Sequence, residues 1–267
     1  MADGQAPDVT YAVEEGVATI TLNRPDRMNT ISGPMLDALS AHLVSANADK
    51  AVRVVILTGT GRAFCAGLDL VQATQGEGIG SSESVSDVTI DLRNTPPTIL
   101  FEMDKPVICA LNGSAAGYGM DLALGCDIRV MADNAKLAAA FVRRGVVPES
   151  GGTWLLPRLL GWAKAAELIF TGRTLSAAES LELGLVNQVA PAAEIGVAAL
   201  ALAREIAGNA PLAVQSAKRM MRMGLEEGFA THVQHVYLQL LPLFRSHDFK
   251  EGMTSFLQKR PPAFQGR

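Results

Sequence analysis

The sequence predicts an α/β protein with a largely parallel sheet, followed by a helical C-terminal region. Two segments rich in β-branched residues, 52–57 and 107–111, have the composition of buried strands. Segments with helical periodicity separate the strands, as in βαβ units. After Pro191 the pattern is helical to the end of the chain. We therefore expect a core domain over residues 1–195 and a helical region over residues 196–267.

The first elements follow from alternation and from helix-start signals. Apolar residues alternate in part over residues 9–23, which predicts an opening hairpin, and Asn23-Arg-Pro-Asp26 interrupts it. Ser32 and Pro34 mark a helix start, and leucines then recur at helical spacing. Residues 72–95 shift to Gly, Ser, Glu and Asp, which predicts a long loop of functional importance.

The second half of the chain carries a clear helix-start signal. Ser176-Ala-Ala-Glu179 has the form of a capping box, and Gly184 is placed to end the helix that the box begins. The C-terminal pattern predicts four further helices, over 192–208, 211–223, 226–241 and 248–258.

Composition and charge exclude several classes of protein. The net charge is −4 and no long basic run is present, so nucleic-acid binding is not expected. The N-terminus has neither the charge nor the apolar stretch of a signal peptide, and no apolar run suits a membrane span. The three cysteines show no metal-binding spacing, so we expect reduced core thiols in a cytoplasmic protein, with no metal site.

Three glycine-rich segments, 61–70, 112–121 and 147–154, follow or interrupt apolar runs. Glycine at a strand-to-helix turn permits unusual backbone angles and leaves N–H groups pointing at a ligand. Close packing alone would also favour small residues, but three such segments in one chain favour a site lined by backbone.

Other site signatures are missing or misplaced. The sequence has no P-loop and no GxSxG elbow, and Gly76-Glu-Gly-Ile-Gly80 lies in the predicted loop rather than after a strand. His232 and His235 are three apart on a predicted helix, but no carboxylate or third ligand is evident, so we expect solvated or interface histidines.

From about residue 9 to residue 264 the sequence resembles the crotonase superfamily, which is also called the enoyl-CoA hydratase/isomerase family. The resemblance is carried by Asn23-Arg-Pro, Leu57-Thr-Gly-Thr-Gly-Arg-Ala-Phe-Cys-Ala-Gly-Leu-Asp69, Lys105-Pro-Val-Ile-Cys-Ala-Leu-Asn-Gly113, Gly125-Cys-Asp-Ile-Arg129, Gly151-Gly-Thr153 with Leu156-Pro-Arg-Leu159, Thr171-Gly-Arg through Gly184-Leu-Val186, Glu251-Gly-Met and Phe256-Leu-Gln-Lys-Arg260.

The resemblance implies the crotonase fold, a spiral of β–β–α units with a C-terminal helical trimerisation region. It implies a homotrimer, or a hexamer made of two trimers, that binds an acyl-CoA thioester and takes part in acyl-CoA chemistry such as fatty-acid β-oxidation. Coenzyme A is then part of the substrate, and no separate cofactor is expected.

By position in the family motifs, the thioester oxygen would lie between the backbone N–H groups of Leu68 and Tyr118. Removing a proton beside a thioester places charge on that oxygen, and preorganised N–H donors favour the charge. Because both donors are backbone groups, the side chains can vary. Tyr118 stands where the family often has glycine.

The acid and base positions depart from the hydratase pattern. Hydratases of the family use two glutamates, which would fall on Asp121 and Phe141 here, and a phenyl ring carries no proton. Glu149, eight residues after Phe141, resembles the acidic residue of the family's double-bond and ring-epoxide isomerases. A single carboxylate suits an isomerase, so Glu149 is the expected acid/base, with Asp121 assisting or holding backbone.

Several alternatives remain open from the sequence. Asp121 and Glu149 together could hydrate the double bond, the chain could bind acyl-CoA without catalysis, or Glu149 could act as a nucleophile. Lys259 resembles a C-terminal lysine of the family that reaches the phosphates of coenzyme A, commonly from a neighbouring subunit. Arg24 and Arg27 are candidates near the adenine end, and Ala66 and Leu68 are further candidates for contact with coenzyme A. Each of the three cations could instead be a solvated surface residue.

Overall fold

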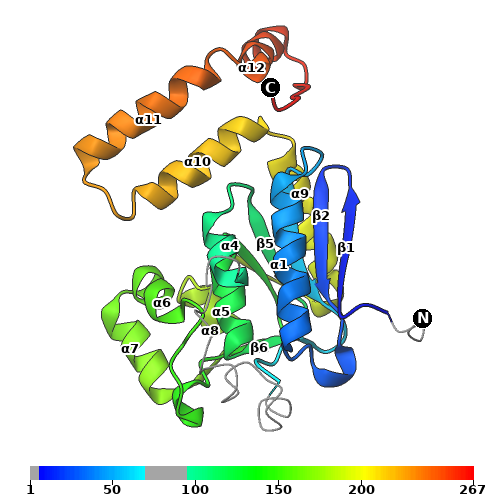
Figure 1. Ribbon diagram of the computed structural model, residues 1–267, viewed down its shortest axis with the longest axis vertical. Helices are drawn as coiled ribbons and strands as arrows, with labels where there is room; N and C mark the ends of the chain where they lie inside the picture. The colour runs from blue at the N-terminus through cyan, green and yellow to red at the C-terminus, as the bar shows by residue number, and fades with distance from the viewer. Residues whose placement is uncertain (1–5, 70–94) are drawn as a thin grey trace, which may run out of the picture.

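The computed structural model describes residues 6–69 and 95–267, and it contains two sheets surrounded by helices (Figure 1). The larger sheet has the strand order β1 (Val9–Glu14), β2 (Val17–Leu22), β3 (Val54–Gly59), β5 (Val107–Leu111), β7 (Ile128–Ala132) and β10 (Gln188–Ala190). The smaller sheet has the order β4 (Ala63–Cys65), β6 (Ser114–Ala116), β8 (Lys136–Ala138) and β9 (Thr174–Ser176).

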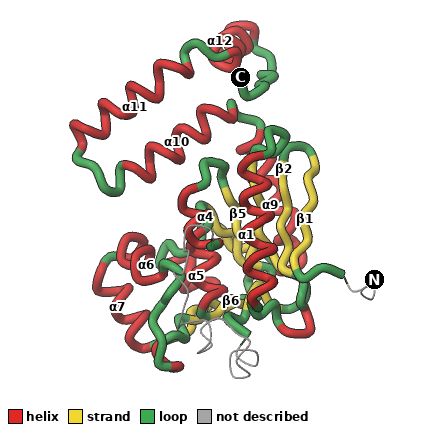
Figure 2. Tube along the Cα trace, in the orientation of Figure 1, coloured by secondary structure: helices red, strands yellow, loops and turns green. Residues whose placement is uncertain are grey.

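Helices cover the larger sheet and continue beyond it at the C-terminal end (Figure 2). Those of the first two thirds are η1 (Pro25–Arg27), α1 (Gly33–Ala48), α4 (Pro96–Glu102), α5 (Tyr118–Gly125), η3 (Val142–Arg144), α6 (Gly152–Leu160), α7 (Trp162–Thr171) and α8 (Ala177–Glu182). The remaining ones are η4 (Ala192–Glu194), α9 (Ile195–Ala207), α10 (Pro211–Met223), α11 (Phe229–Leu243) and α12 (His247–Gln258).

The predicted parallel sheet is confirmed. Within the described strands, β2, β3, β5, β7 and β10 pair in parallel, and antiparallel pairs occur between β1 and β2 and between β8 and β9. All five residues of β5 are buried, as expected for a parallel strand covered on both faces. Helix α1 packs on the hairpin and α9 packs on β3, β5 and β7.

Three long strands are each followed within a few residues by a short strand of the second sheet: β3 by β4, β5 by β6, and β7 by β8. This repetition is the β–β–α spiral that the family resemblance implies. The crossing between β5 and β6 requires glycine, because a Cβ at Gly113 would lie 2.3 Å from the carbonyl oxygen of Arg62. The spiral therefore brings the ends of β4 and β6 side by side.

The local start signals that the sequence predicts are present. The Ser32 side chain accepts a hydrogen bond from the N–H of Met35 at the start of α1. Ser176 and Glu179 form both hydrogen bonds of a capping box, and Gly184, just beyond α8, has a φ of 75°. The predicted loop at 72–95 and its Gly76–Gly80 segment lie outside the described residues, except for Thr95.

The boundary between core and helical region lies later than residue 195. Helix α9 buries Ile195, Ala199, Ala203 and Ala207 against the sheet, so it belongs to the core. Helices α10, α11 and α12 extend away from the sheet (Figure 1). The helical region is thus better described as beginning near Pro211.

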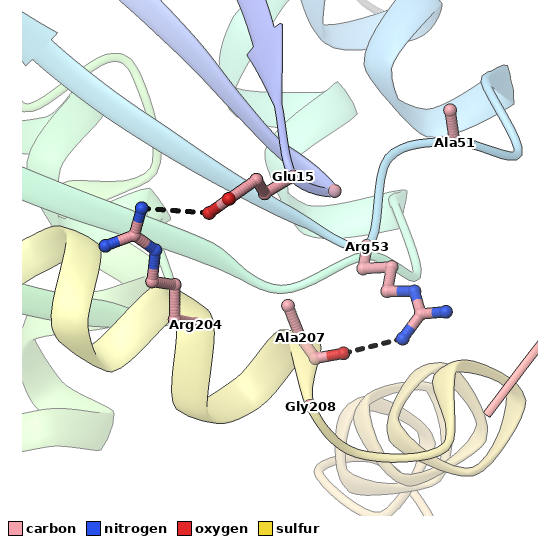
Figure 3. A pocket seen from close by; sticks show the side chains of 7 residues that line it. Glu15, Ala51, Arg53, Arg204, Ala207 and Gly208 are labelled. Atoms are coloured by element: carbon pink, nitrogen blue, oxygen red, sulfur yellow. Dashed lines mark hydrogen bonds and ion pairs between the residues drawn. The ribbon is translucent and has the colours of Figure 1, made fainter. Parts of the chain in front are cut away.

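Two contacts of Arg53 connect the core with the end of the chain. Arg53 donates hydrogen bonds to the carbonyl oxygens of Ala207 at 2.8 Å and Phe264 at 2.6 Å. A cavity of about 430 Å³ lies beside it, with the Arg204–Glu15 ion pair at 2.9 Å on its wall (Figure 3). Both arginines already have partners, and this cavity lies at the opposite end of the sheet from β4 and β6.

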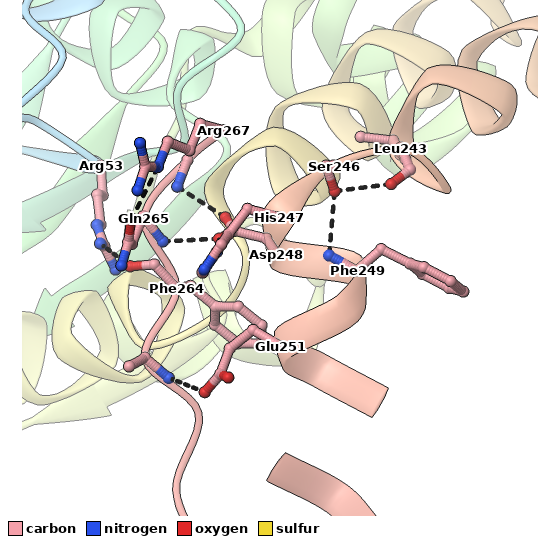
Figure 4. Close-up of polar contacts among 12 residues, drawn as sticks. Arg53, Leu243, Ser246, His247, Asp248, Phe249, Glu251, Phe264, Gln265 and Arg267 are labelled. Atoms are coloured by element: carbon pink, nitrogen blue, oxygen red, sulfur yellow. Dashed lines mark hydrogen bonds and ion pairs between the residues drawn. The ribbon is translucent and has the colours of Figure 1, made fainter. Parts of the chain in front are cut away.

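The tail after α12 is held by two carboxylates (Figure 4). Asp248 accepts hydrogen bonds from the N–H groups of Gln265 and Gly266, both at 2.7 Å. Glu251 accepts a hydrogen bond from the N–H of Ala263 and pairs with Arg260. The final residues are therefore an ordered part of the α12 region.

The cysteine prediction is confirmed, because Cys65, Cys109 and Cys126 are free and buried. The histidine interpretation needs a correction. A carboxylate does lie nearby: Glu227 pairs with His232 at 3.2 Å and with His235 at 2.7 Å. The helix predicted over 226–241 includes Glu227, whereas α11 begins at Phe229, so Glu227 lies in the preceding turn and reaches both rings from there. Within the described residues, no group of three or more candidate ligands is arranged for a metal ion.

No single helix of the described chain is long and apolar enough to cross a bilayer. One bent pair, 192–207 with 211–223, meets the length and composition criteria together, with an angle of 103° between its halves.

Candidate active site

The first wall of the site is the turn that follows β4. Gly67 has a φ of 107°, which only glycine adopts without strain. The carbonyl of Gly67 accepts from the N–H of Ile31, and the N–H of Asp69 donates to the carbonyl of Ile31. These two bonds fix the extended chain on one edge, so the N–H of Leu68 points to the opposite side, and it has no hydrogen-bond acceptor among the described residues.

The second wall is the turn between β6 and α5. Gly117 has a φ of 53° and a ψ of −124°. Its N–H donates to the carbonyl of Ala138, and the helix begins at Tyr118. The first N–H groups of a helix have no partner within it, and the helix dipole favours negative charge at this end. The N–H of Tyr118 is such a group, and no described residue accepts from it.

The two turns are in contact. A Cβ placed on Gly67 would lie 3.1 Å from the carbonyl oxygen of Ala116 and 4.0 Å from the backbone nitrogen of Tyr118. Leu68 and Tyr118 line one cavity of about 80 Å³. The structure therefore brings the two predicted N–H donors together around one small space, as an oxyanion hole requires.

Glu149 lines the same cavity, on the turn that precedes α6. The turn depends on Gly151, which has a φ of 101°. Glu149 is exposed at the cavity mouth, yet partial desolvation raises the pKa of its carboxyl above the ordinary value. A carboxylate with a raised pKa is a better proton acceptor at neutral pH. The predicted acid/base thus lies beside the predicted donors.

Phe141 forms part of the cavity wall and is 3% exposed. A Cβ on Gly117 would lie 4.0 Å from its ring, so the phenyl group packs against the turn that precedes Tyr118. The position that would carry a second glutamate in hydratases therefore faces the site here but presents an apolar surface.

Asp121 does not line this cavity within the described chain. It is 1% exposed, and its Oδ2 accepts hydrogen bonds from the N–H groups of Ser150 and Gly152, both at 3.2 Å. Burial is the main cause that raises the pKa of Asp121 to about 7; the two N–H bonds lower it and the charge of Glu149 raises it. Of the two roles left open by the sequence, the geometry favours holding backbone.

The structure supports some of the positions proposed for coenzyme A better than others. Ala66 lines the cavity beside Leu68. Arg24 is mostly buried: it pairs with Asp69 at 3.1 Å and donates to the carbonyl of Thr30 at 2.8 Å. Arg27 is exposed and has no side-chain partner among the described residues, which makes it the better placed of the two cations.

Lys259 lies at the far end of the molecule from this cavity. It follows α12 with a φ of 54° and is exposed, while β6 and α5 lie at the opposite end in Figure 1. Lys259 therefore cannot reach the cavity of its own chain. A contact with coenzyme A would require a second subunit, as the resemblance implies.

The sequence did not single out several residues that support the site. Ile31 fixes the Leu68 turn, and Asn29, which is fully buried, donates to the carbonyls of Thr60 and Ala63. Arg144 and Val146 line the cavity. The sequence could have indicated Arg144 and Val146, because they lie on the short segment that brings Phe141 and Glu149 to the same cavity.

Comparisons with known proteins agree with this geometry. The family model for enoyl-CoA hydratase/isomerase matches residues 12–267. The chain belongs to the enoyl-CoA hydratase/isomerase family. The enoyl-CoA hydratase EchA1 of Mycobacterium marinum has a similar structure, with a TM-score of 0.89 and 35% identity, over 98% of this chain and 100% of that one.

Curated relatives in the enoyl-CoA hydratase/isomerase family carry different activities. The chain is 38% identical to 1,2-epoxyphenylacetyl-CoA isomerase of Escherichia coli, over 96% of this chain and 97% of the relative. It is 36% identical to carnitinyl-CoA dehydratase of Salmonella typhi, over 94% and 95% respectively. Family membership thus establishes an enzyme of acyl-CoA metabolism, and the type of reaction depends on the acid/base groups.

Proposed function

We propose that the protein is an isomerase of this family that moves a proton between two carbons of an acyl-CoA, with Glu149 as the only acid/base. The observation that carries the proposal is the set of described residues that line the cavity: among them are two backbone N–H groups without an acceptor and one carboxylate, and Phe141 stands in place of a second acid. A relative with an isomerase name, the Escherichia coli protein, adds support.

The reaction follows from the arrangement. Glu149 removes a proton from the carbon beside the thioester carbonyl, and the electron pair moves onto the carbonyl oxygen as an enolate. The N–H groups of Leu68 and Tyr118 hold that charge; each such donor contributes roughly 3 to 4 kcal/mol in other enzymes. Glu149 then returns the same proton to the carbon two positions further along, and the double bond moves into conjugation. No water and no further cofactor take part.

The test is the conversion of a 3-enoyl-CoA into the 2-enoyl thioester, which is monitored by the absorbance of the conjugated product. Glu149→Gln keeps the shape of the side chain and removes its proton chemistry, so kcat should fall by roughly 100-fold or more. Glu194→Gln, on the exposed η4 segment, is a matched control with unchanged activity. Full turnover in Glu149→Gln would refute the assignment.

A hydratase is the second candidate, and one observation favours it. Oδ1 of Asp121 is buried and has no hydrogen-bond partner in the described chain, so this oxygen keeps a free acceptor site, as a carboxylate that takes part in hydration would. Loss of conjugation on adding crotonyl-CoA, with a rate that exceeds isomerisation, would establish it. Tight binding of coenzyme A without turnover of any acyl-CoA would instead indicate a non-catalytic binding protein. Detection of an acyl-enzyme adduct by mass spectrometry would indicate that Glu149 acts as a nucleophile.

We also propose that α11 and α12 bind a second copy of the chain, in a trimer or a hexamer. Large apolar side chains on these helices are exposed: Phe229, Tyr237, Leu238, Phe256 and Leu257 are 63–84% accessible. Exposure of this extent over neighbouring turns is typical of an interface. Light scattering after size-exclusion chromatography tests the proposal, and a monomer at micromolar concentration would refute it. The buried free thiols support a cytoplasmic location.

A further inference from the structure

Asp121 joins the two halves of the candidate site. It lies on α5, one helical turn after Tyr118, which supplies one oxyanion donor. Its Oδ2 accepts from the N–H groups of Ser150 and Gly152, on the turn that carries Glu149. One carboxylate therefore connects the helix that holds the enolate oxygen to the turn that holds the base.

The fit between this carboxylate and the Glu149 turn is close. A Cβ on Gly152 would lie 2.2 Å from Oδ1 of Asp121 and 2.8 Å from Cβ of Pro148. Any side chain at Gly152 would thus push the carboxylate out of the turn or the turn away from α5. Asp121 is directed into the turn rather than into the cavity that Glu149 lines.

We propose that Asp121 is a positioning residue whose ionised carboxylate holds the Glu149 turn against the oxyanion helix, and so sets the distance between the base and the enolate. The inference rests on the proposed role of Glu149. It goes beyond that role because it removes Asp121 from the chemistry and makes the geometry of the base depend on a charge.

The dependence on charge follows from the two hydrogen bonds. Bonds from N–H groups to an ionised carboxylate are about twice as strong as those to a neutral acceptor. Burial and the charge of Glu149 bring the pKa of Asp121 to about 7, above the ordinary range of a carboxyl. As the pH falls through this value, Asp121 takes up a proton, both bonds weaken and the turn is held less firmly. Activity should therefore gain a step as the pH rises through about 7.

The neighbouring groups do not produce the same step. Burial raises the pKa values of Tyr118 and Cys65, the latter to about 12, so both are neutral near pH 7. On the helices that pack against α5, Glu102 and Arg158 are exposed, and Arg158 lies 3.7 Å from the Trp154 ring centre. Partial burial also raises the pKa of Glu149, and its charge raises that of Asp121, so the step that belongs to Asp121 is identified by its loss in an Asp121 variant.

The experiment measures kcat and KM for 3-enoyl-CoA isomerisation from pH 5 to 9. Wild type should show a rise near pH 7 from Asp121, in addition to the limb that belongs to Glu149. Asp121→Asn keeps the shape and removes the charge, so that rise should disappear and kcat at pH 8 should fall by roughly 10- to 100-fold, with KM little changed. Gly152→Ala keeps the charge but separates the carboxylate from the turn, and the same fall in kcat is expected.

Asp133→Asn is the matched control. Asp133 is exposed and also accepts a backbone hydrogen bond, from the N–H of Ala192 at 3.3 Å, but it lies outside the cavity lining. Its pH profile should equal that of wild type. Melting temperatures of all variants show whether any loss comes from unfolding.

Three results would overturn the inference. The first is a wild-type profile without a rise near pH 7, which needs no variant at all. The second is a rise that persists in Asp121→Asn. The third is loss of hydration of crotonyl-CoA in Asp121→Asn with isomerisation unchanged, which would make Asp121 a second acid/base. By contrast, full activity in Glu149→Gln would refute the proposed function itself, so the two failures are distinguishable.

Discussion

Arg24→Ala should destabilise the protein through the turn that carries Leu68. Arg24 has 14% of its side chain exposed and pairs at 3.1 Å with Asp69, whose side chain is 5% exposed. Asp69 follows Leu68 directly, and its N–H bonds to Ile31. Without the guanidinium, a buried carboxylate would remain uncompensated beside the turn that carries Leu68.

The expected magnitude follows from this burial. Removing one partner of a buried ion pair costs about 3 to 5 kcal/mol, and we expect the lower end because Arg24 is partly exposed. In a chain of this size about 3 kcal/mol corresponds to a fall in melting temperature of roughly 6 to 12 °C. The N–H of Leu68 should also lose its fixed direction, so kcat should fall as well.

The assay combines thermal unfolding with a double-mutant cycle. Arg24→Ala with Asp69→Asn should be less destabilised than the sum of the single variants, by roughly 1 kcal/mol or more. Arg27→Ala is the matched control in the same turn: it should leave the melting temperature unchanged and weaken binding of coenzyme A. A melting temperature of Arg24→Ala within about 2 °C of wild type would refute the reasoning. So would a larger loss of coenzyme A binding in Arg24→Ala than in Arg27→Ala.

Three further predictions concern the oxyanion helix and the tail. Gly117→Ala should lower kcat by roughly 100-fold, because a φ of 53° with a ψ of −124° disfavours a Cβ and the Tyr118 N–H would turn away; wild-type kcat would contradict this. Tyr118→Phe should keep its activity and gain about 1 kcal/mol of stability by thermal unfolding, because the buried hydroxyl has no described partner and the donor is backbone; a tenfold loss of activity would count against it. Glu251, whose pKa is lowered to about 2 mainly by Arg260, stabilises the tail above its unfolded pKa. The protection factors for hydrogen exchange at residues 263–267, taken relative to the intrinsic rate at each pH, should therefore fall as the pH drops from about 5 to 2, and should be lower already at pH 5 in Glu251→Gln.

Local patterns in the sequence predicted most of the fold. The hairpin at 9–22 and the capping box at Ser176 depend on residues a few positions apart, and both are present. The helices at 211–223 and near 248–258 also follow from periodicity, with shifts of one residue at most. These elements need no knowledge of distant contacts.

The site was predictable only in part. The family motifs located Leu68, Tyr118 and Glu149, and the structure lines one cavity with all three. The tie from Asp121 to the Glu149 turn joins residues about 30 positions apart, and no local pattern indicates it. Arg24 illustrates the same limit. The sequence near a basic residue does not show whether its side chain binds a phosphate or pairs with a carboxylate such as Asp69, which is 45 positions away.

The two proposed oxyanion donors, Leu68 and Tyr118, are main-chain amides, and this has a consequence for which substitutions the site can accept. Almost every replacement at Leu68 or Tyr118 leaves the amide hydrogen in place, so substitutions there that still pack well can reshape the cavity and keep the donor. The glycines at 67 and 117, with φ values of 107° and 53°, have no such freedom. Purifying selection should therefore act on the two residues without side chains, while new substrate preferences arise next to them.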